Sequence, residues 1–297
     1  MSGLSAAMPL AHAAQGAAEQ WYDVLGILVV AGLAATYGRG VHELWARRGA
    51  GAVLPRWRAA AFALGLLSVL GAQQGPIHDM AEDSLAGHMT QHMLLMLLAG
   101  PLLAAGGAAL PLVVAVPRPV RGLVARARVT SAARWVRRPL NTALLTAGLY
   151  TVVLWAWHLP APYRWVEDSA ATHGAEHLSL VAVSWLLWST LVGPHPARLS
   201  PPVGLLLLFV TGMAAAALGA MLTLAPAPIY PVQLLAGPDP LADQQLAGLV
   251  MWVPMDVVML AAAVVLFLRW LTALDQRVPA DRDLRPADDT AAEEVRA

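Results

Sequence analysis

Seven long apolar stretches divide the 297-residue chain, and they constrain its fold more than any other feature. A helix needs about 20 mostly apolar residues to cross the hydrocarbon layer of a membrane. The composition agrees, since 58% of the residues are hydrophobic and only 13% are charged. We therefore expect an all-α integral membrane protein, a bundle of about seven transmembrane helices. The expected spans are residues 23–45, 58–74, 87–114 (with a kink or stop near 106, after Gly100-Pro101), 140–158, 173–192, 203–225 and 245–271.

The distribution of Arg residues predicts how this bundle is oriented. The chain has no Lys, so its 19 basic residues are all Arg. All of them except Arg164 fall on the same side of the expected spans, and basic residues gather on the cytoplasmic side of membrane proteins. We therefore expect the N-terminus outside and the C-terminus in the cytoplasm, with the chain crossing the plasma membrane several times.

The segments outside the apolar stretches are short. We expect residues 1–22 to form a short extracytoplasmic tail, 23–272 to form the transmembrane domain, and 273–297 to form a disordered cytoplasmic tail, because this last segment is polar, acidic and interrupted by Pro. Residues 118–138 alternate Arg with apolar residues. This segment could be an amphipathic helix on the inner membrane surface or a solvated loop.

Five of the nine His residues are expected at the outer ends of three spans. His88 and His92 form one H-x-x-x-H pair, and His173 and His177 form a second. Residues four apart lie on one helix face, so each pair can offer two imidazoles to one metal ion. His158 ends the fourth span at the same depth. The alternative for each His is an ordinary interfacial residue, but two such pairs at one depth favour a metal or cofactor site.

The remaining candidate ligands follow from the absence of Cys, which leaves His, Met and carboxylate as metal-binding groups. Met96 continues the stripe of His88 and His92, and thioethers with imidazoles suit Cu(I). Glu176 and Asp243 are expected to orient imidazoles or to guide metal entry. Asp256 lies inside the last span and is expected to be protonated or paired. Met251, Met255 and Met259 form a stripe there that could be packing or part of a path.

Four blocks of sequence resemble one known family. They are GHMTQHMLLMLLAGPLL (87–103), WHLPAPY (157–163), HGAEHLSLVAVSWLLW (173–188) and DQQLAGLVMWVP (243–254). In this order they are similar to the CtaG family of membrane cytochrome c oxidase assembly factors, associated with caa-type oxidases, over about residues 20–272. The resemblance implies a role in oxidase assembly, with copper delivery as the usual supposition. Its motif residues here are His88, Gln91, His92, His158, His173, His177, Asp243, Gln244 and Gln245.

The sequence therefore predicts a non-enzymatic assembly factor that binds copper, as Cu(I), at an outward-facing site and helps deliver it to the oxidase. Its expected partners are oxidase subunits, membrane lipid and an extracytoplasmic copper donor, with no nucleic acid. We expect His88, His92, His173 and His177 to bind the metal, with His158 and Met96 as additional ligands and with Asp243, Glu176 and Gln91 supporting them.

Three other functions remain open at this point. Two imidazoles from different helices could bind haem b in an electron-transfer protein. The Met stripe and Asp256 could line the path of a copper importer. A metal-dependent enzyme acting on lipid or quinone would need a base, for which Glu176 is the candidate. The sequence contains no P-loop, no H-E-x-x-H and no nucleophile elbow, so ATP-driven transport, zincin proteolysis and serine hydrolysis have no support.

Overall fold

The protein is helical throughout the part that the structure describes. A computed structural model describes residues 4–192, 199–235 and 238–275, and these residues contain no strand. The helices are α1 (Leu4–Arg48), α2 (Arg56–Gln73), α3 (Pro76–Asp83), α4 (Leu85–Met93), the π-helical turn η1 (Leu94–Ala99), α5 (Gly100–Ala105), α6 (Ala109–Ala115), α7 (Arg118–Arg128), α8 (Ser131–Val136), α9 (Pro139–Trp157), α10 (Pro160–Glu167), α11 (Ala170–Leu191), α12 (Pro201–Thr223), the 3-10 turn η2 (Val232–Leu234) and α13 (Pro240–Asp275).

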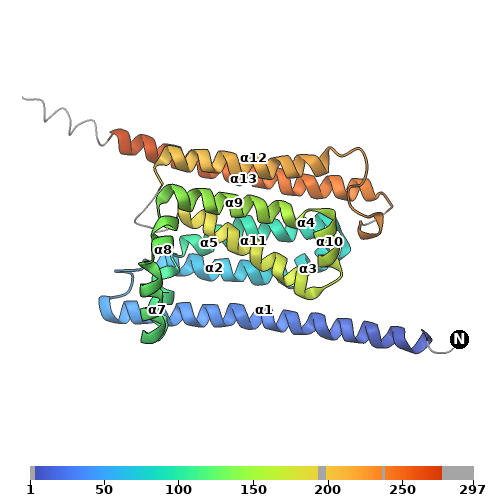
Figure 1. The fold of residues 1–297 in the computed structure, drawn as a ribbon, viewed down its shortest axis with the longest axis horizontal. Coiled ribbons are helices and arrows are strands. Elements are labelled where there is room, and N and C mark those ends of the chain that lie inside the picture. The colour runs from blue at the N-terminus through green and yellow to red at the C-terminus, as the bar shows by residue number, and fades with distance from the viewer. Residues whose placement is uncertain (1–3, 193–198, 236–237, 276–297) are drawn as a thin grey trace, which may run out of the picture.

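The long helices run along one common axis (Figure 1). α12 and α13 pair along one edge of the bundle, α1 forms the opposite edge, and α2, α9 and α11 lie between them. α4, η1 and α5 follow one another through the interior, where they pack on α13, α2 and α11. One apolar core joins α4, α9, α11, α12 and α13, and a second joins α1, α2 and the η1–α5 segment.

Four helices are long and apolar enough to cross a membrane by themselves: α9, α12, α13 and the Val24–Arg48 part of α1. Two bent pairs raise the number to six if each pair is one span. One pair is α2 with α3, bent by 43°, and the other is the Leu85–Ala105 segment with α6, bent by 66°. The second bend falls between Ala105 and Ala109, close to the expected interruption near residue 106. The integral membrane class is therefore supported with four to six candidate spans.

The expected fifth span, residues 173–192, is not among these candidates. It corresponds to α11, which carries His173, Glu176 and His177 in its first two turns. These side chains lower its mean hydropathy, although α11 packs against α1, α5, α9 and η1 in the middle of the bundle. A helix enclosed by other helices does not need a uniformly apolar surface, because its polar groups face protein rather than lipid.

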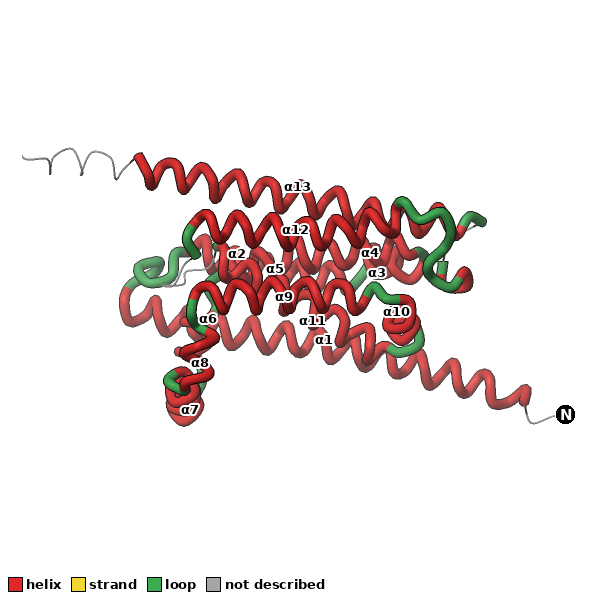
Figure 2. Tube along the Cα trace, turned by 45° about the horizontal axis from the view of Figure 1, so that its top comes forward, coloured by secondary structure: helices red, strands yellow, loops and turns green. Residues whose placement is uncertain are grey.

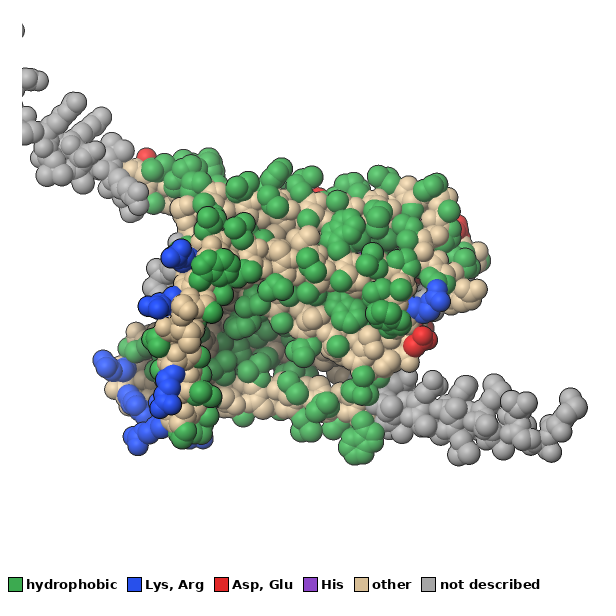
Figure 3. Space-filling view, in the orientation of Figure 1, with side chains coloured by type: hydrophobic (Ala, Val, Ile, Leu, Met, Phe, Trp, Pro, Cys, Tyr) green, Lys and Arg blue, Asp and Glu red, His purple; other side chains and the backbone are tan. Residues whose placement is uncertain are grey.

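The Arg-rich segment is helical rather than a plain loop. α7 and α8 run across one end of the bundle instead of along it, as both ribbon views show (Figure 2). Arg side chains gather over this end in the space-filling view, whereas the flank of the bundle is mostly apolar (Figure 3). Leu123, Val129 and Trp135 are exposed beside these cations. An amphipathic arrangement at this end is therefore present in the fold.

The two expected tails are described only in part. α1 extends back to Leu4, so residues 4–22 continue the first helix. α13 ends at Asp275, and the expected disordered tail lies almost entirely outside the described residues. The assignment of both segments as tails remains a prediction.

A close contact between α5 and α11 holds the interior of the bundle together. Ser184 on α11 is completely buried, and its hydroxyl donates a 2.6 Å hydrogen bond to the Met96 carbonyl. A Cβ atom at Gly100 would overlap this hydroxyl. Gly148 on α9 has no atom near the corresponding position, so it offers a matched control.

We expect Gly100→Ala to lower the unfolding free energy by about 1–3 kcal/mol, because the added methyl group overpacks a filled interior. Thermal unfolding in detergent, followed by circular dichroism, measures the effect. Gly148→Ala is expected to leave the melting temperature unchanged or slightly raised, since Ala favours helix more than Gly does. Equal melting of the two variants would contradict the close packing of α5 on α11.

Candidate metal centre

Two side chains cap the start of the helix that carries the first His pair. Ser84 precedes α4, and its hydroxyl accepts a 3.0 Å hydrogen bond from the Gly87 N–H. The Asp243 carboxylate, on α13, accepts hydrogen bonds from the N–H groups of Leu85 at 3.1 Å and Ala86 at 3.2 Å. The first N–H groups of a helix have no partner within the helix, so these contacts stabilise the start of α4. Asp243 thus ties α4 to α13 across 158 residues of sequence.

The two H-x-x-x-H pairs face each other. The ring centroids of His88 and His92 lie 4.5 Å apart on α4, and those of His173 and His177 lie 4.2 Å apart on α11. Across the helices, His88 stacks on His173 at 5.2 Å, and His92 lies 5.6 Å from His177. The four imidazoles therefore form one cluster, as the sequence-based site requires.

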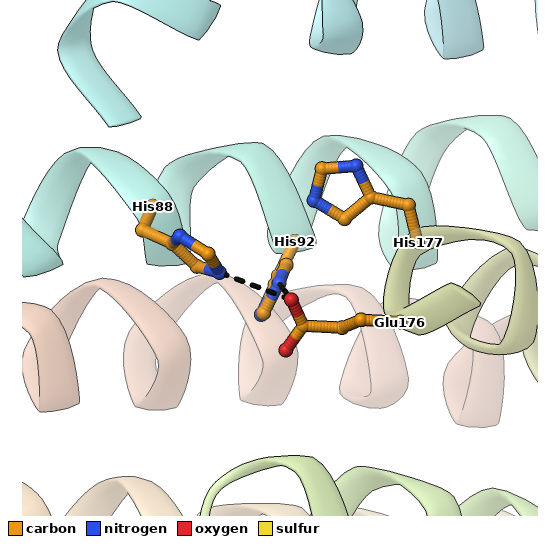
Figure 4. A group of neighbouring side chains, drawn as sticks. All are labelled: His88, His92, Glu176 and His177. Atoms are coloured by element: carbon orange, nitrogen blue, oxygen red, sulfur yellow. Dashed lines mark hydrogen bonds and ion pairs between the residues drawn. The ribbon is translucent and has the colours of Figure 1, made fainter. Parts of the chain in front are cut away.

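Glu176 supplies a carboxylate in the middle of this cluster (Figure 4). Its Oε2 atom lies 3.3 Å from His88 Nε2 and 3.5 Å from His92 Nε2, and its side chain is only 1% exposed. His88, His92, Glu176 and His177 each offer a ligand atom, and these atoms lie within 4.8 Å of one another. We call these four residues the inner group. Three imidazoles and one carboxylate at this spacing can hold one metal ion.

His92 shows that the inner group is chemically incomplete. Its side chain is fully buried, its Nδ1 atom makes no hydrogen bond within the described part of the chain, and its Nε2 atom has only the 3.5 Å contact with Glu176 Oε2. A buried polar atom without a partner costs about 1–3 kcal/mol, and such atoms require an explanation in a well-packed interior. A cation bound by the ring would supply the missing interaction, so the residues fit a metal ion.

The other predicted ligands are placed differently. The His158 ring lies 5.4 Å from the His92 ring, which brings all five imidazoles into one region. His158 Nε2 lies 3.2 Å from the sulfur of Met89, not that of Met96. Met96 is fully buried, and its backbone carbonyl accepts the hydrogen bond from Ser184. The assignment of Met96 as a ligand remains a prediction.

Gln91 and Asp256 have contacts that the sequence did not identify. The Gln91 amide donates a 2.6 Å hydrogen bond to the Ala72 carbonyl, so Gln91 joins α4 to α2. The Asp256 carboxylate accepts a 2.8 Å hydrogen bond from the Trp252 indole N–H, one turn away on α13. Gln91 therefore positions α4, as the Asp243 cap described above does. A closer role of either residue at a metal remains a prediction.

Three residues near the cluster were missed from the sequence. Glu167 on α10 brings Oε1 to 3.9 Å from His88 Nδ1, and its side chain is 35% exposed, so it lies at the rim of the buried cluster. The Tyr163 ring lies 5.7 Å from the His88 ring, and the Tyr230 hydroxyl donates a 2.9 Å hydrogen bond to the His158 carbonyl. Tyr163 lies in the WHLPAPY block, but no spacing rule pointed to Glu167 or Tyr230.

The two tyrosines remain neutral hydrogen-bond donors. Burial raises the pKa of both hydroxyls, and the nearby Glu167 charge raises the pKa of Tyr163 further. Gln244 holds the Tyr230 segment in place, because its Oε1 atom accepts a 2.6 Å hydrogen bond from the Ile229 N–H. The Ile229–Tyr230 part of the segment between α12 and α13 is thereby held beside His158, at the end of α9.

Comparison with known families agrees with this architecture. The family model described as cytochrome c oxidase caa3 assembly factor matches residues 35–273. The chain belongs to this family. The resemblance predicted from the four sequence blocks is thus confirmed over most of the chain, and the matched range contains every residue of the inner group. No curated protein and no solved structure matches the sequence.

Asp243 provides a test of how the site is positioned. We expect Asp243→Ala to lower the unfolding free energy by about 1–2 kcal/mol, because two N–H groups of α4 lose their acceptor. Asp243→Asn keeps one acceptor oxygen and is expected to lose less. Thermal unfolding in detergent gives the order of the melting temperatures, and Asp168→Asn, an exposed residue after α10, is the control. If Asp243→Ala melts like the control, the cap does not stabilise α4.

Proposed function

We propose that this assembly factor binds copper as cargo at the inner group and helps deliver it to cytochrome c oxidase. The observation that carries the proposal is the buried cluster of imidazoles around Glu176, in which the Nδ1 atom of His92 lacks a hydrogen-bond partner. Imidazole is a good ligand for copper, and the adjacent Met89 thioether favours Cu(I). The role requires no bond to be made or broken in a substrate, so the protein is not proposed to be an enzyme.

The position of Glu167 supports access from the outer end of the bundle. Glu167 is partly exposed, whereas the inner group is buried. A carboxylate at this rim attracts cations and lies in contact distance of His88. We propose that an extracytoplasmic copper donor approaches this end and that oxidase subunits receive the metal there.

The opposite locations of the cluster and the Arg-rich helices support a proposed orientation in the membrane. The start of α4, α10 and the start of α11 lie at one end of the bundle, and α7 and α8 lie at the other (Figure 1). We propose that α7 and α8 rest at the cytoplasmic surface of the bacterial plasma membrane. We also propose that α11 crosses the membrane inside the bundle, which brings the number of spans to seven. The N-terminus of the chain then lies outside and its C-terminus inside.

The copper proposal is tested by metal content. After copper loading, the detergent-purified chain is expected to hold about one equivalent at the inner group, because three imidazoles and a carboxylate are enough ligands for one ion. The double variant His88→Ala/His177→Ala is expected to lose it. Elemental analysis measures the metal, and circular dichroism confirms equal helicity.

The double variant also separates delivery from scaffolding. In cells that lack the natural gene, it is expected to fail to restore oxidase activity while reaching the membrane in normal amount. Absence of copper from both purified proteins, with helicity intact, would exclude the metal site. A scaffold role in oxidase assembly would then be the better account.

Single cysteines test the orientation, because the chain has none of its own. Ser169→Cys precedes α11 at the outer end, and Ser131→Cys begins α8 at the other end. We expect a membrane-impermeant maleimide to label Ser169→Cys in intact spheroplasts, and to label Ser131→Cys only after permeabilisation. Labelling of both in intact spheroplasts would contradict an odd number of spans between them.

Specific contacts weigh against the other functions. A haem needs an open slot between two imidazoles, whereas His92 is fully buried with three other imidazoles within 5.6 Å of its ring. Met251, Met255 and Met259 belong to the apolar core, and Met255 accepts a hydrogen bond from the Tyr150 hydroxyl at 3.3 Å. Core packing therefore explains the positions of these three Met residues, and no import path is needed to account for them. Glu176 is engaged by two imidazoles, which leaves it a poor general base for a membrane enzyme.

A further inference from the structure

His158 and Met89 form a pair that the inner group does not include. His158 follows the last residue of α9, and Met89 lies on α4 beside His88. Both side chains are buried, and His158 Nε2 lies 3.2 Å from the Met89 sulfur. Residues 69 positions apart in sequence therefore place one nitrogen and one sulfur atom in direct contact.

The hydrogen bonds of His158 identify which nitrogen carries the proton. His158 Nδ1 lies 2.6 Å from the Leu154 carbonyl oxygen, which can only accept a hydrogen bond. Nδ1 must therefore be the donor. A neutral imidazole has a single N–H, so Nε2 presents a lone pair to Met89.

This arrangement leaves two lone pairs facing each other. A thioether has no hydrogen to donate, so no hydrogen bond can join Nε2 to the sulfur in the neutral state. A cation between the two atoms would satisfy both lone pairs. The His92 ring lies 5.4 Å from the His158 ring, and its Nδ1 atom also has no hydrogen-bond partner among the described residues.

We propose that His158 and Met89 form a second, softer subsite for a monovalent cation such as Cu(I), with His92 as the shared neighbour. The proposal rests on the proposed copper-binding function and specifies the oxidation state of the cargo. Thioether ligands select Cu(I), whereas carboxylate ligands suit harder ions. The inner group, which contains Glu176, therefore accepts divalent ions, and the Met89 subsite discriminates in favour of the reduced ion.

The experiment compares two probes on the detergent-purified full chain. Ag(I) is a soft monovalent ion that does not change oxidation state, and Zn(II) reports on the inner group. Met89→Leu removes the sulfur and nearly conserves side-chain volume, so the fold is expected to persist. We expect this variant to bind Ag(I) at least tenfold more weakly and Zn(II) within twofold of the unmodified chain, by calorimetric titration. Met80→Leu, on the exposed surface of α3, is the control and should change neither.

X-ray absorption of the Cu(I)-loaded chain gives an independent result that does not depend on a variant. A sulfur atom in the coordination shell is expected, and its loss in Met89→Leu would assign it. Absence of sulfur from the unmodified chain, or equal Ag(I) affinity in Met89→Leu, would overturn the subsite. If Met89→Leu weakened the binding of Ag(I) and of Zn(II) to the same extent, the His158–Met89 pair would not be a separate site. Failure of the unmodified chain to bind either ion would instead exclude the proposed copper function.

Discussion

The side-chain contacts between α4 and α11 around a buried carboxylate are the interaction on which the rest of the structure depends. Glu176 lies among imidazoles from both helices, with its Oε2 atom 3.3 Å from His88 and 3.5 Å from His92. Burial of ionisable groups is costly unless they are paired or bind a metal. The surrounding contacts hold these groups in register: Asp243 caps α4, Gln91 joins α4 to α2, and Ser184 joins α11 to the η1 turn.

This arrangement divides the molecule along its long axis. One end contains the polar cluster, Glu167 at its rim and the Tyr230 segment beside His158. The middle is packed by apolar residues and by close contacts such as that of Gly100 with Ser184. The opposite end carries the cations of α7 and α8. This member of an oxidase assembly factor family thus has its candidate metal ligands at one end of the bundle and its Arg-rich helices at the other.

The sequence predicted the helical membrane class because apolar stretches of spanning length can be read directly from composition. It also predicted the two His pairs, since residues four apart must share a helix face whatever the rest of the fold does. The sequence also predicted a span at residues 173–192, which correspond to α11, but this helix is not among the candidate spans. Its polar first turns resemble an interfacial segment, and only its enclosure by α1, α5 and α9 explains how a helix carrying Glu176 and two His residues is accommodated.

The sequence by itself determined the family, the local helices and the residue types available to a metal. The tertiary structure alone decided which of those residues meet. It brought Met89 to His158, Glu167 to His88 and Asp243 to the start of α4. None of these contacts follows from a periodicity, because each joins residues on different helices. Their distances depend on how the helices pack, and packing is set by the shapes of many side chains together.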